Sequence, residues 1–74
     1  MSKVLVIEDD EMLNAGLCYN LQKKQIEVKE AYSLADARMI LEQGHYDLAL
    51  LDVNLPDGDG FSFARELEER YHLP

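Results

Sequence analysis

Hydrophobic residues follow two different spacings along the chain, and these predict three strands and three helices in alternation. Short apolar or alternating runs at residues 4–7, 26–31 and 46–51 predict strands. In the intervening stretches 11–24, 34–43 and 60–71, apolar residues recur at the three- to four-residue spacing of one helix face. This order predicts an α/β fold with a parallel sheet and right-handed crossovers.

The character of each strand predicts its place in the sheet. Residues 4–7 and 46–51 are almost continuously apolar, which is typical of strands covered on both faces, whereas residues 26–31 alternate like an edge strand. We therefore expect a three-layer domain with strand order 2-1-3, the opening of a flavodoxin-like fold. In that order the strand 46–51 would lie at an edge, so we expect residues 1–74 to be the N-terminal portion of one larger domain.

Polar residues at the helix ends, and apolar residues within the helices, predict caps and buried faces. Asp10 is expected to cap the first helix, and Ser33 with Asp36 resembles a capping box at the second. The expected buried faces comprise Leu13, Leu17 and Leu21 in the first helix, Leu34, Ala37, Ile40 and Leu41 in the second, and Phe61, Ala64, Leu67 and Tyr71 in the third.

Acidic residues follow two of the predicted strands, at the edge where doubly wound sheets bind ligands. Glu8 and Asp9 come directly after the first strand and Asp52 directly after the third, so order 2-1-3 places all three carboxylates together. Their mutual repulsion favours a divalent cation such as Mg²⁺, to which Asn54 could add its main-chain oxygen. Asp52 stands alone at its strand end and is the better candidate nucleophile, able to form an aspartyl phosphate.

The net charge and the cysteine content indicate which binding partners and which cellular compartment suit this sequence. Fifteen acidic residues against seven basic ones give a net charge of −8, which opposes binding to nucleic acid or an anionic membrane. The single cysteine, Cys18, and the absence of a recognisable signal peptide or membrane span suit the cytoplasm.

Two acidic segments resemble the signatures of bacterial response-regulator receiver domains. These are Val-Leu-Val-Ile-Glu-Asp-Asp at 4–10 and Leu-Leu-Asp-Val-Asn-Leu-Pro-Asp-Gly-Asp-Gly at 50–60, and the resemblance covers essentially the whole chain. It implies that Asp52 accepts a phosphoryl group from a histidine kinase, with Mg²⁺ held by Glu8, Asp9, Asp52 and the main-chain oxygen of Asn54. The Glu-Asp pair looks most like regulators that carry a winged-helix DNA-binding domain, which implies an output in transcription.

The family pattern also requires residues that these 74 positions do not contain. A Ser or Thr after the fourth strand and a Lys after the fifth belong to the family mechanism. We therefore expect residues 1–74 alone to bind Mg²⁺, to accept phosphate poorly and not to switch. A receiver of this kind is a phosphoacceptor and not an enzyme.

The sequence is also compatible, to different degrees, with functions other than a receiver. The main rival is an interaction module in which a second copy pairs with the exposed strand 46–51. A calcium-loop interpretation of 52–60 fails because Pro56 occupies the fifth position, where a ligand is needed. A phosphohydrolase is disfavoured because no general acid lies near Asp52 in the sequence. Cys18, His45 and His72 are expected to have no redox or metal-binding role.

Overall fold

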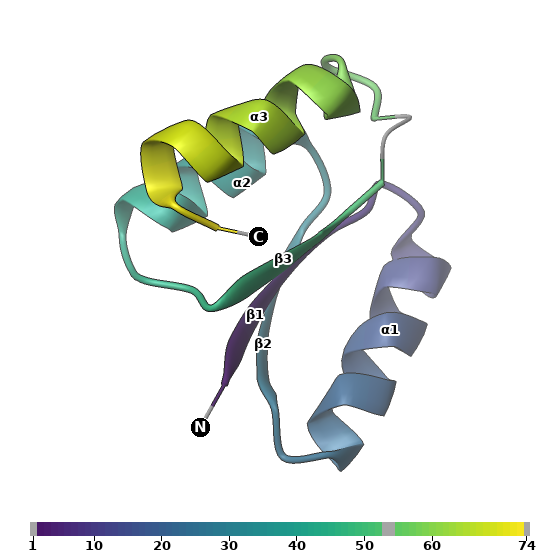
Figure 1. The fold of residues 1–74 in the computed structure, drawn as a ribbon. Coiled ribbons are helices and arrows are strands. Elements are labelled where there is room, and N and C mark those ends of the chain that lie inside the picture. The colour runs from purple at the N-terminus through teal and green to yellow at the C-terminus, as the bar shows by residue number, and fades with distance from the viewer. Residues whose placement is uncertain (1, 53–54, 74) are drawn as a thin grey trace.

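A three-stranded parallel sheet lies between one helix on one face and two helices on the other (Figure 1). The computed structural model describes residues 2–52 and 55–73. In chain order the elements are β1 (Lys3–Ile7), α1 (Glu11–Lys23), β2 (Glu27–Ala31), α2 (Leu34–Glu42), β3 (Leu48–Leu51) and α3 (Gly60–Tyr71). The sheet order is β2-β1-β3, which confirms the predicted α/β architecture.

The central strand β1 separates two hydrophobic clusters. Leu5 and Ile7 point to the side of α2 and α3, while Val4 and Val6 point to the side of α1. Successive side chains of a strand face opposite sides of the sheet, and all four are buried. The unbroken apolar run therefore reflects cover on both faces, as predicted.

Strand β3 begins two residues later than its apolar run suggested. The run starts at Tyr46, but that ring lies beside β1, with the Lys3 ammonium 4.8 Å from its centroid. Asp47 then joins the start of β1, since its backbone N–H donates to the Lys3 carbonyl and its carboxylate accepts from the Lys3 N–H. Regular pairing starts only at Leu48, opposite Val4.

Helix α1 begins as predicted and buries part of its predicted face: Leu17 and Leu21 are half-buried and pack against the cluster of Val4, Val6 and Cys18. Asp10 caps it by accepting hydrogen bonds from the Met12 and Leu13 N–H groups at 3.0 and 3.1 Å. Its fully buried residues are Asn14 and Cys18, whereas Leu13 is 51% exposed. The leucine spacing did not include Asn14, which donates hydrogen bonds to the carbonyl groups of Glu8 and Ala31.

Helix α3 also buries only part of its predicted face: Leu67 is buried and the half-buried Tyr71 packs against the core. Gly60, Phe63 and Leu67 are its buried residues, while Phe61 is 72% exposed and Ala64 is exposed. Positions separated by three and four residues share one helix side, so burying Phe63 and Leu67 necessarily turns Phe61 outward. On α2, Leu34, Ala37 and Leu41 are buried, as the predicted face requires.

Candidate metal centre

The pairing of the strands brings residues distant in sequence to one edge of the sheet. Ile7 pairs with Leu51 of β3 on one side and with Ala31 of β2 on the other. The backbone ladders run one residue further, because the Asp52 N–H donates to the Ile7 carbonyl at 3.0 Å and the Glu8 N–H to the Ala31 carbonyl at 2.9 Å. Glu8 and Asp52 therefore leave neighbouring strands at the same level.

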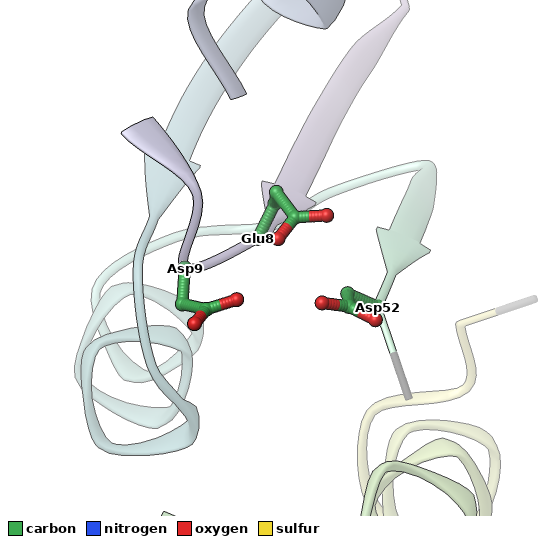
Figure 2. A group of neighbouring side chains, drawn as sticks. All are labelled: Glu8, Asp9 and Asp52. Atoms are coloured by element: carbon green, nitrogen blue, oxygen red, sulfur yellow. The ribbon is translucent and has the colours of Figure 1, made fainter. Parts of the chain in front are cut away.

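Three carboxyl groups converge at this edge (Figure 2). Glu8, Asp9 and Asp52 each offer one oxygen atom, and these atoms all lie within 4.8 Å of one another. Glu8 is buried, Asp52 is half-buried and Asp9 is exposed, so solvent reaches the cluster at Asp9. Among the described residues, no other group of three acidic, histidine or cysteine side chains is close enough to hold a metal.

Groups around Glu8 shift the pKa of its carboxyl group in both directions. The Asp10 N–H donates to Glu8 Oε2 at 3.1 Å, and this hydrogen bond lowers the pKa of Glu8. Burial, together with the nearby carboxyl groups of Asp9 and Asp52, acts in the opposite direction and leaves the pKa of Glu8 raised. The cluster thus contains repulsion that a bound cation would relieve.

This donor set fits Mg²⁺. Hard divalent cations prefer carboxylate, carbonyl and water oxygens, and Mg²⁺ usually takes one or two protein carboxylates and keeps several waters. The cluster offers three carboxylate oxygens, and Asp9 is exposed to solvent. The fourth residue predicted for this site, Asn54, lies outside the described residues.

One buried polar side chain beside the site was not recognised from the sequence. Asn14 of α1 is 0% exposed and donates to the Glu8 carbonyl, so it contacts the backbone that carries the acidic pair. The sequence does contain an indication of this position, because Asn14 lies four residues before Cys18 and residues at that spacing share a helix face. The predicted face did not include Asn14 because it was defined by leucines alone.

Comparison with known proteins identifies the family. The family model described as the response regulator receiver domain matches residues 4–74. The chain belongs to this family. It is also 40% identical over 73 residues to the transcriptional regulatory protein BasR of Escherichia coli K12, a match covering 97% of this chain and 33% of BasR. The chain therefore spans about a third of that relative.

Solved receiver structures have the same arrangement of elements. A two-component response regulator from Clostridium difficile matches with a TM-score of 0.95 and 28% identity, over 100% of this chain and 61% of the other. The response regulator TrrA from Thermotoga maritima, solved in complex with Mg²⁺ and BeF, matches with a TM-score of 0.90 and 28% identity, over 97% and 63%. The receiver fold is thus shared over nearly all of this chain, while both relatives are longer.

The structure also bears on membrane association. In the part of the chain that the structure describes, no helix is both long and apolar enough to cross a bilayer.

Proposed function

We propose that Asp52 accepts a phosphoryl group from a histidine kinase of a two-component system, in a reaction that requires Mg²⁺. The observation that carries this proposal is the convergence of Glu8, Asp9 and Asp52 within 4.8 Å at the carboxyl edge of a receiver sheet. In such sheets ligands bind outside the strand ends where the strand order reverses. Asp52 is half-buried, so part of this residue is exposed to solvent.

The reaction is a transfer between two protein side chains. A carboxylate oxygen of Asp52 attacks the phosphorus of the kinase phosphohistidine and forms the new O–P bond of an aspartyl phosphate. The P–N bond breaks, and its electron pair returns to the imidazole nitrogen. When bound, Mg²⁺ would supply positive charge that offsets the repulsion between the phosphoryl oxygens and the attacking carboxylate.

The other residues of the site bind and orient. Glu8 and Asp9 would hold the cation from the end of β1, and Asp52 would contribute a ligand from the end of β3. We include the main-chain oxygen of Asn54 as a further ligand on the strength of the family resemblance. The exposed side of Asp9 leaves room for water and phosphate oxygens around the metal.

We further propose that residues 1–74 form the N-terminal portion of a single receiver domain, whose remaining strands complete the site. The family's lysine and hydroxyl residue lie outside these positions, and phosphoryl transfer depends strongly on such positive charge and hydrogen bonds. Residues 1–74 alone should therefore bind Mg²⁺ and accept phosphate slowly. The similarity to BasR, a transcriptional regulatory protein, supports transcription as the output. We propose that this output runs through a winged-helix domain and that the protein acts in the cytoplasm, as the family resemblance implies.

The test is an intact-mass measurement after incubation with a small acyl phosphate and Mg²⁺. We expect a slow gain of one phosphoryl group in the wild-type chain and none in Asp52→Asn, which keeps the shape of the side chain and removes the nucleophile. Chelating the Mg²⁺ should prevent the gain. A phosphoryl group that also appears on Asp52→Asn, or that forms equally without Mg²⁺, would contradict the proposal.

A second candidate function is self-association through β3. Within the described residues β3 pairs only with β1, and Leu48 at its start is 37% exposed. An apolar strand with one free edge can pair with a second copy and form a symmetric dimer. Light scattering over a range of concentrations tests this: a dimer that Leu48→Lys disperses would support it, and a monomer at every concentration would exclude it.

A further inference from the structure

The side chain of Asn14 has all of its hydrogen-bonding groups occupied inside the protein. Its Nδ2 donates to the carbonyl of Glu8 at 3.0 Å and to the carbonyl of Ala31 at 3.1 Å. Its Oδ1 accepts from the Sγ of Cys18 at 3.3 Å. Asn14 is 0% exposed, and apart from Glu8 it is the only polar residue that is buried among those described.

Chemistry fixes which way the Asn14 amide points. Two carbonyl oxygens can only accept, so the NH₂ group must face them. The Cys18 thiol on the other side must then donate, which requires its protonated form. Burial, with a smaller effect of Glu30, raises the pKa of the Cys18 thiol and keeps it protonated near neutral pH.

The bond to Glu8 has a particular consequence for the acidic site. The Glu8 carbonyl belongs to the peptide group that joins Glu8 to Asp9, so Asn14 holds the plane of that peptide. The peptide group before Glu8 is held as well, because the Glu8 N–H donates to the same Ala31 carbonyl that accepts from Asn14. Both peptide groups that flank Glu8 are thereby fixed relative to β2.

We propose that Asn14 is a positioning residue for the metal centre, which holds the Glu8–Asp9 peptide in the geometry that directs both carboxylates toward Asp52. The inference rests on the proposed function, since it needs these carboxylates to bind Mg²⁺. Groups that orient metal ligands from behind commonly contribute about 10–100-fold to metal affinity. A purely structural asparagine would affect folding stability and leave the affinity of folded molecules unchanged.

The first test compares Mg²⁺ affinity between variants that remain folded. Asn14→Leu keeps the approximate shape and removes both donors, and Asn14→Ser is smaller and keeps one hydroxyl donor. Leu41→Val is the control, because Leu41 lies in the core cluster on the opposite side of the sheet. Titrations followed by NMR, at a temperature where circular dichroism shows folded protein, should give roughly tenfold weaker binding for both Asn14 variants. The control should bind like the wild type.

The second test uses the wild-type chain and does not depend on any variant folding. If Asn14 supports the metal-bound geometry, Mg²⁺ must in turn stabilise the Asn14 hydrogen bonds, because coupling between two sites is reciprocal. Solvent exchange of the Asn14 side-chain amide protons should therefore slow when Mg²⁺ saturates the site. Exchange that is unchanged by saturating Mg²⁺ would overturn the inference.

The two failures can be told apart. A wild-type chain that binds no Mg²⁺ would overturn the proposed function and the role of Asn14 with it. Wild-type binding with unaltered affinity in folded Asn14→Leu and Asn14→Ser would overturn the positioning role alone, and would leave Asn14 as a residue that only stabilises the fold.

Discussion

Gln25, at the end of α1, adopts a left-handed backbone conformation with φ 62°. It completes a helix-ending motif in which its own N–H donates to the Gln22 carbonyl and the Ile26 N–H donates to the Leu21 carbonyl. Leu21 and Ile26 also pack against the same core cluster. These are the features of a Schellman motif, whose left-handed position is usually glycine because a Cβ is disfavoured there.

Replacing Gln25 by glycine should therefore stabilise the protein. The substitution relieves the left-handed strain, while the greater freedom of glycine in the unfolded chain offsets part of the gain. We expect an increase of about 0.5–1 kcal/mol in the free energy of unfolding, measured by urea denaturation. Gln25→Ala is the control and should give no such gain. Equal effects of the two substitutions would show that the conformation of Gln25 carries no strain.

Individual side chains differed in how well the sequence predicted them. Asp10 was predictable because a cap depends on local geometry, and its two hydrogen bonds confirm it. Asn14 was not, because its partners are the backbone carbonyls of Glu8, directly after β1, and Ala31, at the end of β2, which become close only in the folded protein. The role of Asp57 was not predictable either, because the backbone N–H groups that donate to its carboxylate lie 22 and 23 residues away in the sequence.

At the scale of elements, the segment before α3 is fastened to the start of α2. The Asp57 carboxylate accepts hydrogen bonds from the Leu34 N–H at 2.9 Å and the Ala35 N–H at 3.1 Å. These N–H groups belong to the first turn of α2 and have no partner within the helix. The two hydrogen bonds lower the pKa of Asp57. The connection from β3 to α3 is thus tied to a second helix.

This contact predicts a pH dependence of stability. Because the pKa of Asp57 is lower in the folded protein than in the unfolded chain, the contact stabilises fully above the ordinary aspartate pKa of about 3.9. That contribution is lost as the pH falls through the lower pKa of the folded state. In urea denaturation, Asp57→Asn should be less stable than the wild type by a constant amount at neutral pH. The difference should shrink in acid, and a difference independent of pH would contradict the assignment.

Gly58 packs against the same part of α2. A Cβ built at this position would lie 2.4 Å from Leu34 Cδ1, and Leu34 is buried in the core. Gly58→Ala should therefore force Leu34 to shift and destabilise the protein by about 1–3 kcal/mol, measured by thermal or urea unfolding.

The matched substitution Gly16→Ala meets no atom within 4 Å and lies inside α1. It should stabilise by about 0.5–1 kcal/mol, and a stabilising Gly58→Ala would contradict this packing.

At the scale of the whole molecule, strand order was more predictable than helix orientation. The apolar character of residues 4–7 and the alternation in 26–31 are set by how many faces of a strand are covered, so order 2-1-3 followed directly. Helix orientation depends on which side chains fit the sheet. On α3 the sequence offered Phe61 and Phe63 on different sides, and only packing chose Phe63. The acidic cluster was predictable because it requires only the order of the strands and the residues at their ends.

The measurement that tests the account most directly is a Mg²⁺ titration followed by NMR. We predict one saturable site whose signals change at Glu8, Asp9 and Asp52, with binding at least roughly tenfold weaker in Asp9→Asn. Glu68→Gln, an exposed position on α3 with the same change of charge, should bind like the wild type. Equal weakening in Asp9→Asn and Glu68→Gln, or changes spread over the whole acidic surface, would mean that Mg²⁺ only screens the net charge of −8. That result would contradict the metal centre on which the phosphoacceptor role of Asp52 depends.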